Sequence, residues 1–306
     1  MVDQIIVTID THRSSAGRYR CSDYLGRLAD LRAAIDEVRQ RYRHVQVIDV
    51  DYSPQTQRKV AGFFFDANSV PVKAWDGGPF YAYFFGLYAA NARHVMHFDG
   101  DMMFGGGSRT WIKEALACME HRPDVLMMAP LAGPPRVNGR AVQPIRGETL
   151  HAVEGMATEA YRYAHISTRA FLVDLSRFKS RLGALPQIRP TVAQRLKSRL
   201  LGNPPAVLEA ERLISQTMQR ANLYRIDLLG EGPGLWSLHP PYRSEEFYQR
   251  LPEVISAVER GTVPDGQRGD YNLNDSMIDW TRARADNHWH RRYLRMLRQR
   301  LPVASE

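Results

Sequence analysis

Short apolar runs alternate with amphipathic segments along the first part of this 306-residue chain. The runs Ile5–Thr11 and Val45–Val50 have the length and β-branched content of strands, and Tyr24–Tyr42 between them places apolar residues at helical spacing. Strands and helices that alternate in sequence form parallel sheets through right-handed crossovers. The alternation predicts an α/β fold with a mixed, mainly parallel sheet flanked by helices.

The same alternation continues to about residue 130 and is looser beyond it. We expect further strands at Val70–Trp75, His94–Phe98, Val125–Pro130 and Leu223–Leu229, and helices at Gln55–Phe65, Asp76–Asn91, Trp111–Glu120 and Ala206–Ala221. Leu185–Pro205 is basic and bounded by prolines, which predicts a loop, either a flap over a substrate or plain surface.

Composition limits the kind of protein that this chain can be. Apolar residues make up 44% of it and charged residues 24%, as in ordinary soluble globular proteins. Cys21 and Cys118 share no motif with each other or with nearby histidines, which argues against disulfides and structural zinc. No signal peptide is visible, and the longest apolar stretch, Pro79–Ala92, is too short to span a membrane. We therefore expect a cytoplasmic protein.

The net charge of +8 is concentrated near the C-terminus. Between Arg282 and Arg300 lie seven arginines, two histidines, Trp289 and Tyr293, opposed only by Asp286. Such a segment suits peripheral contact with an anionic membrane. The alternative is a solvated helix that packs through leucines at helical spacing, Leu294, Leu297 and Leu301. We expect no nucleic-acid partner.

An aspartate pair, Asp99 and Asp101, follows directly after the apolar run His94–Phe98. This order predicts a buried strand that ends at a polar crevice, where ligands bind in open α/β sheets. Two carboxylates this close repel each other unless a cation neutralises them, and hard oxygen ligands suit Mn²⁺ or Mg²⁺. Gly100 between them would let a diphosphate approach the backbone. The pair predicts a metal that carries a phosphorylated substrate.

Two further residues have both a functional and an ordinary interpretation. Asp51 ends the second predicted strand, where it would accept hydrogen bonds from a nucleobase or ribose, or would only form the turn before Ser53-Pro54. His239 is held by the two prolines that follow it, and is either a metal ligand or a hydrogen-bonded packing histidine.

The helix Ala206–Ala221 contains a candidate general base. Glu211 lies four residues after Val207 and three before Ile214, inside the apolar stripe, whereas Glu209 points about 200° away from it. Burial would raise the pKa of a carboxyl towards the range of a general base. A salt bridge to one of the many arginines is the alternative.

Taken together, these motifs resemble the nucleotide-sugar glycosyltransferases of the GT-A fold, closest to the family 2 type. The resemblance runs from about residue 4 to 245 and includes the first strand, Val50–Pro54, His97–Asp101, His165–Leu175 and the acidic helix before Leu223–Ile226, ending at His239. The Gln-x-x-Arg-Trp motif of processive synthases is absent.

The resemblance implies a GT-A domain over residues 1–262, with a nucleotide-sugar-binding half (1–130) and an acceptor half (131–262), and a basic helical extension (263–306). It implies a metal-dependent enzyme that uses Mn²⁺ or Mg²⁺ and moves a sugar from a nucleotide-diphosphate donor to a saccharide or lipid-linked acceptor. Inversion and a single addition are expected.

The resemblance also implies roles for single residues. Asp51 would contact the nucleobase, Asp99 the ribose or metal, and Asp101 the metal, with His239 completing the metal site. Thr11, Asp76 and Gly100 are further donor-binding candidates. Glu211 would be the base, with Glu209 as the alternative, although Arg212 stands where the family has an aspartate.

Two other functions stay open. A nucleotidyltransferase shares the sheet and a metal carboxylate, but the segment after Thr11 is only a faint version of its glycine-rich loop. A non-catalytic protein that binds nucleotide sugars is the other. A haloacid-dehalogenase-type phosphatase is disfavoured, because Met103 stands where that family needs Thr or Val.

Overall fold

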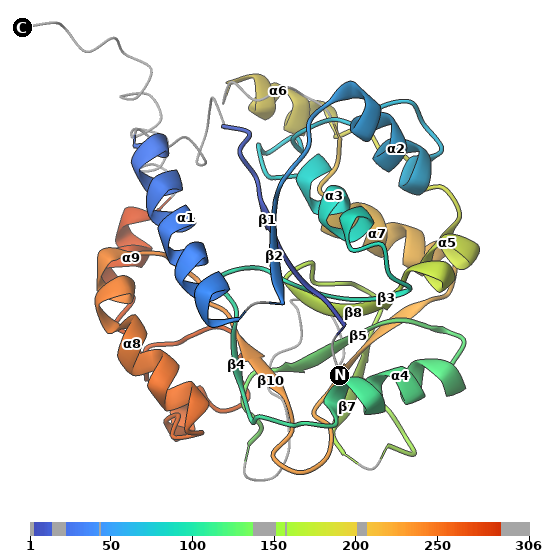
Figure 1. The fold of residues 1–306 in the computed structure, drawn as a ribbon. Coiled ribbons are helices and arrows are strands. Elements are labelled where there is room, and N and C mark those ends of the chain that lie inside the picture. Colours follow the sequence, from blue (N-terminus) through green and yellow to red (C-terminus); the bar gives the residue numbers. More distant parts are fainter. Residues whose placement is uncertain are drawn as a thin grey trace, which may run out of the picture. The chain divides into compact units, whose positions relative to one another are not determined.

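The computed structural model describes residues 3–13, 23–42, 44–136, 151–156, 158–200 and 207–288 (Figure 1). The chain divides into two compact units, one of residues 1–92 with 183–213 and one of residues 93–182 with 214–306. Within the described ranges, no helix is both long and apolar enough to cross a membrane.

The first unit contains a two-stranded parallel sheet. β1 (Ile5–Ile9) pairs with β2 (Val45–Asp49), and α1 (Tyr24–Arg41) makes the crossover that the sequence predicts. α1 begins at Asp23, whose side chain accepts a hydrogen bond from the backbone N–H of Gly26. Its predicted apolar stripe is not covered, because no residue of α1 is buried.

Aromatic side chains form the core of the first unit. α2 (Pro54–Phe65) packs on α3 (Tyr81–Ala89), with the Phe64 and Phe84 rings 5.1 Å apart and both almost fully buried. The strand expected at Val70–Trp75 does not form. Its backbone forms local hydrogen bonds instead. The N–H of Ala74 donates to the carbonyl of Gly78, so the turn Asp76–Gly78 uses a backbone group that would otherwise pair with a neighbouring strand.

The segment 183–213 returns to this unit through backbone hydrogen bonds. The N–H of Leu185 donates to Phe64 and that of Trp75 donates to Val207, at 2.8 and 3.0 Å. Where a loop was expected, α6 (Val192–Leu200) forms. Thr191 and Gln194 exchange side-chain-to-backbone hydrogen bonds, a capping box that starts this helix. α7 (Ala210–Arg220) begins in this unit and continues into the second.

The second unit is built on a mixed sheet in the order β3-β8-β5-β9-β7-β6, with β10 beside β5 and β4 beside β10. The expectation of a mainly parallel sheet is wrong here, because most pairs among the described strands are antiparallel and only β5 with β9 and β10 with β5 are parallel. The bounds are β3 His94–Phe98, β4 Met103–Gly105, β5 Val125–Ala132, β6 His151–Ala152, β7 Ala160–Tyr163, β8 Ala170–Asp174, β9 Tyr224–Leu228 and β10 Trp236–Leu238.

β3 also differs from the buried strand that its apolar run predicts. It lies at one end of the strand order, pairs only with β8 among the described strands, and has exposed residues at both of its ends. Among the described residues, one side of its backbone has no strand neighbour, as at the edge of a sheet.

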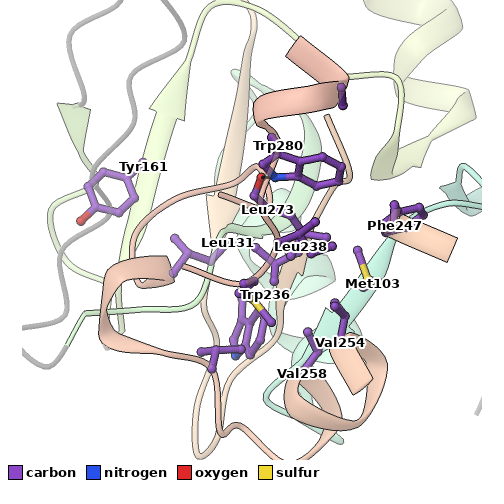
Figure 2. Packing of buried hydrophobic residues seen from close by; sticks show 14 of the residues in the cluster. Met103, Leu131, Tyr161, Trp236, Leu238, Phe247, Val254, Val258, Leu273 and Trp280 are labelled. Atoms are coloured by element: carbon purple, nitrogen blue, oxygen red, sulfur yellow. Dashed lines mark hydrogen bonds between the residues drawn. The ribbon is translucent and has the colours of Figure 1, made fainter. Parts of the chain in front are cut away.

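Helices complete the second unit: α4 (Trp111–His121), α5 (Leu175–Leu182), α8 (Glu245–Glu259) and α9 (Thr281–Asp286), with a 3₁₀ turn at Asp265–Gln267. Figure 2 shows side chains of α8, with Leu273 and Trp280 that follow it in the chain, packed with those of β4 and β10. Trp280 is buried there, and its Nε1 donates to the carbonyl of Leu273 at 2.7 Å. This core fixes β4 and β10, the two strands next to the predicted site.

Only the start of the basic segment Arg282–Arg300 falls within the described residues. Arg282 pairs with Glu246 at 3.0 Å, and Arg284 pairs with Asp275. Residues 289–306, with Trp289, Tyr293 and the leucines, lie outside them.

Candidate functional site

The aspartate pair forms the link between β3 and β4. The backbone N–H of Asp99 donates to the carbonyl of Arg169 at 2.6 Å, and the N–H of Met102 returns to the carbonyl of Asp99. Nε2 of His97 lies 3.4 Å from Oδ1 of Asp99. The Asp99 side chain is nearly half exposed, and that of Asp101 less so. The two carboxylates therefore stand on a turn that is held on both sides.

Strand pairing brings His239 to the same place. β10 runs antiparallel to β4 with Leu238 opposite Met103, so the next residue, His239, comes opposite the turn that carries Asp101. Nη2 of Arg243 forms an ion pair with Oδ2 of Asp101 and lies 3.3 Å from Nε2 of His239. One guanidinium nitrogen thus contacts both side chains.

The other carboxylate oxygen of Asp101 has unused bonding capacity. Oδ1 is buried and finds no hydrogen-bond partner among the residues that the structure describes. A buried carboxylate oxygen without a partner is costly unless a ligand, a water molecule or an ion satisfies it. This oxygen marks the place where a ligand would gain most.

His239 is held as a neutral imidazole with a fixed orientation. Its Nδ1 lies 3.2 Å from Oδ1 of Asn272, so Nδ1 carries the proton and the lone pair of Nε2 faces Arg243. Burial lowers the pKa of His239 to about 4 and the charge of Arg169 adds to the effect, against the opposing influence of Asn272 and Asp99. A neutral imidazole held by a second residue is the form that binds metals.

An aromatic residue and an arginine enclose this imidazole. The ring of Tyr271 stacks on His239 with centroids 5.9 Å apart and an angle of 12° between the planes. Burial raises the pKa of the Tyr271 hydroxyl, and the charge of Arg169 offsets part of the rise. Arg243 pairs with Asp101 and the charge of Arg169 acts on His239, so the site has positive groups that suit a phosphate-bearing ligand.

The chemical types of the side chains fit a divalent cation: the carboxylates of Asp99 and Asp101, the second with its Oδ1 without a partner among the described residues, and the neutral imidazole of His239. The side chains do not converge as they stand, because no group of three or more His, Cys, Asp or Glu residues within the described ranges could hold a metal. Arg243 fills the space between Asp101 and His239. Metal binding here would require Arg243 to move.

A second polar cluster lies in the first unit, at the end of β1. Asp10 accepts hydrogen bonds from the hydroxyl of Tyr52 at 2.6 Å and from Nζ of Lys73 at 2.8 Å. Burial alone would raise the pKa of Asp10, but these two partners outweigh it and lower the pKa. The ring of Tyr52 packs between His12 and Tyr81, each with centroids 5.2 Å away. This cluster presents aromatic faces beside a charged pair.

The predicted donor-binding residues of the first unit mostly serve local structure. Both oxygens of Asp51 accept hydrogen bonds, from Ser53 and from the hydroxyl of Thr56, and these bonds lower its pKa. Asp76 accepts from the N–H of Gly78, and the carbonyl of Thr11 accepts from the hydroxyl of Tyr24. Asp51 therefore forms the turn before Ser53-Pro54, and its contact with a donor stays a prediction.

The burial predicted for Glu211, the candidate base, is wrong. α7 begins only at Ala210, so Glu209 precedes the helix, and Glu211 is exposed. Glu209 is half-buried, and its Oε2 is buried without a hydrogen-bond partner among the described residues. Ile214 and Ser215, one turn after Glu211, are buried, so Glu211 shares their side of the helix but lies in its exposed first turn. Glu209, the alternative, is the less exposed of the two residues.

Sequence reasoning missed several residues of these clusters. Arg243 follows His239 by four residues and Asp10 stands between β1 and Thr11, so position along the chain offered a signal for both. Tyr271 and Asn272 come from a Gly- and Asp-rich break that carries no motif. They reach the site because the N–H of His239 donates to the carbonyl of Tyr271.

Neither the protein-family models nor the curated proteins give a match to this chain. Among solved structures, the chain is similar to one described as "Crystal structure of GalNAc-T7 with UDP, GalNAc and Mn2+", with a TM-score of 0.40 and 13% sequence identity. The match covers 82% of this chain and 42% of that chain, so it spans less than half of the neighbour's length. A likeness at this level says nothing about function.

Proposed function

We propose that this protein is a metal-dependent glycosyltransferase of the GT-A type, which transfers a sugar from a nucleotide-diphosphate donor to an acceptor hydroxyl. The observation that carries the proposal is the meeting of Asp101, which precedes β4, with His239 and Arg243, which follow β10. Carboxylates, a neutral imidazole and a movable cation are the groups needed to hold a metal with a diphosphate. The GT-A domain is proposed to cover residues 1–262.

Asp99, Asp101 and His239 would hold Mn²⁺ or Mg²⁺, which when bound would neutralise diphosphate charge. Arg243 supplies positive charge beside Asp101, and Arg169 supplies it near His239. Arg243 would transfer its ion pair from Asp101 to a phosphate. Gly100 leaves the backbone of the turn open, because nothing lies within 4 Å of the place of a Cβ there. Thr11, Asp51 and Asp76 of the first unit are the further proposed donor-binding residues.

Glu209 is the proposed general base, in place of Glu211. Its half-buried carboxylate, with one oxygen unpartnered, is suited to accept the proton of an acceptor hydroxyl. A single displacement with such a base inverts the configuration at the anomeric carbon. A saccharide or a lipid-linked sugar is the proposed acceptor, and one addition the proposed outcome.

The direct test is nucleoside diphosphate release from UDP-, GDP- and dTDP-sugars with Mn²⁺, for the full chain and for Asp101→Asn. Asp265→Asn, at an exposed aspartate far along the chain, is the matched control. Release that Asp101→Asn abolishes and Asp265→Asn retains supports the proposal. Binding without release would favour a non-catalytic protein, and pyrophosphate release from nucleoside triphosphates would favour a nucleotidyltransferase.

A further inference from the structure

α6 carries an apolar stripe that no described residue covers. Val192, Leu196 and Leu200 are spaced by four residues and are exposed to 72%, 60% and 54%. Large apolar side chains exposed singly are common, but three in a row on one short helix form a contiguous patch. This patch was not apparent from the sequence, which predicted a loop at this position.

The opposite side of α6 is attached to the first unit. At about 100° per residue, Ser198 lies on the far side of the helix from Leu196, and Ser198 is completely buried. Nζ of Lys197 lies 5.8 Å from the centre of the Trp75 ring, at the edge of the buried side. The helix is therefore fixed in an orientation that leaves its apolar stripe facing solvent.

Positive charge borders the stripe, and the stretch of sequence that contains α6 has no acidic residue. Between Gly183 and Leu208 the chain has four basic residues and no acidic one, with Arg195 and Arg199 along one edge of the stripe and Lys197 along the other. α1 also exposes apolar residues, Leu25 and Leu31, but it carries both charges, with Asp36 beside Arg39. α6 therefore differs from α1 in carrying charged residues of one sign only.

We propose that α6 docks the protein on the surface of an anionic phospholipid bilayer. A helix that inserts an apolar stripe between the headgroups, with basic side chains on both flanks, gains apolar burial and electrostatic attraction together. Long Arg and Lys side chains can keep their charges at the phosphates while the stripe enters. The proposal is independent of the glycosyltransferase assignment, because it concerns only where the protein binds.

Vesicle co-sedimentation of the full chain tests this docking. Vesicles of equal parts phosphatidylglycerol and phosphatidylcholine are compared with phosphatidylcholine alone, at low and high ionic strength. We expect binding to the anionic vesicles that weakens with salt, and a loss of about tenfold or more in partitioning for the double variant Val192→Ser, Leu196→Ser. Arg195→Gln with Arg199→Gln should also weaken binding.

Two controls separate α6 from other surfaces. Leu25→Ser with Leu31→Ser removes exposed apolar side chains from α1 and should bind like the unaltered chain. Arg291→Gln with Arg292→Gln lowers the charge of the C-terminal segment. Thermal unfolding of each variant checks its fold, which exposed substitutions should leave intact.

The docking proposal is overturned if the unaltered chain does not bind anionic vesicles, or binds phosphatidylcholine equally well. It is also overturned if the α6 variants bind normally while the C-terminal variant loses binding, since the C-terminal segment would then be the attachment.

Discussion

The guanidinium of Arg243 forms an ion pair with the carboxylate of Asp101. The same nitrogen lies 3.3 Å from Nε2 of His239, so one cation occupies the place next to both side chains. A resident cation competes with any other positive group for these lone pairs. The first prediction follows from this competition.

Arg243→Gln should bind Mn²⁺ alone more tightly than the unaltered chain, by about tenfold, because the competing charge is gone. Electron paramagnetic resonance of free Mn²⁺ measures this affinity without any need for turnover. Arg250→Gln, at an arginine of α8 that pairs with Glu253, is the matched control and should leave Mn²⁺ affinity unchanged. Weaker binding by Arg243→Gln would show that Arg243 does not compete with the metal.

Glu209→Gln should lower turnover by about 10²-fold or more while donor affinity is kept, because the proton of the acceptor hydroxyl would lose its base. Glu211→Gln is the matched control, since Glu211 is exposed two residues away. Steady-state kinetics of sugar transfer, with donor binding measured separately, decides between them. The opposite pattern would return the role to Glu211, and two silent variants would place the base elsewhere.

Gly100 and Gly105 should respond differently to alanine. Nothing lies within 4 Å of a Cβ at Gly100, whereas a Cβ at Gly105 would overlap the ring of Trp236. Gly100→Ala should keep its thermal midpoint and lose nucleoside diphosphate affinity, because a diphosphate approaches the backbone there. Gly105→Ala should lower the free energy of unfolding by about 2 kcal/mol. Unchanged affinity in Gly100→Ala would remove Gly100 from the donor site.

The pair Asp10–Lys73 should make stability depend on pH in the acid range. The folded state lowers the pKa of Asp10 below its ordinary value of 3.8, so the unfolded chain takes up the proton more readily. The stabilisation is therefore complete above about pH 5 and is lost as pH falls through the folded pKa.

Lys73→Met should cost about 2 kcal/mol at pH 7 and less in acid, because it removes the partner that keeps Asp10 ionised. Urea unfolding at pH 7 and pH 3 measures both values, with the exposed Lys113→Met as control. An equal loss at the two pH values would show that Asp10 does not depend on Lys73 for its charge.

Much of the N-terminal half could be predicted from the sequence, because β1, α1 and β2 are set by local periodicity. The strand predicted at Val70–Trp75 does not form. Its apolar content fits a strand, but its backbone forms hydrogen bonds with the turn at Asp76–Gly78 instead. The strand order of the second unit was not accessible either. Pairs such as β7 with β9 depend on long-range packing, which no local pattern encodes.

The candidate site likewise combines residues that the sequence indicates with residues that only the tertiary structure brings in. Asp99, Asp101 and His239 carry motifs that can be recognised in the sequence, and the pairing of β4 with β10 brings the last two together. Arg243, Tyr271 and Asn272 carry none and join the site only through tertiary contacts. Glu211 is in phase with the buried residues of α7 but lies in its exposed first turn, and Glu209 precedes the helix, so periodicity alone did not predict which glutamate is less exposed.

The central claim is that Asp101 belongs to a site for a metal with a nucleoside diphosphate. Isothermal titration calorimetry of UDP, GDP, dTDP and ADP, each with and without Mn²⁺, tests it on the unaltered chain and on Asp101→Asn. The account predicts that at least one of these diphosphates binds only with Mn²⁺, and that Asp101→Asn, with an unchanged thermal midpoint, loses at least about tenfold of that affinity. Equal Mn²⁺-dependent affinity in both proteins, or no Mn²⁺-dependent binding to the unaltered chain, would contradict it.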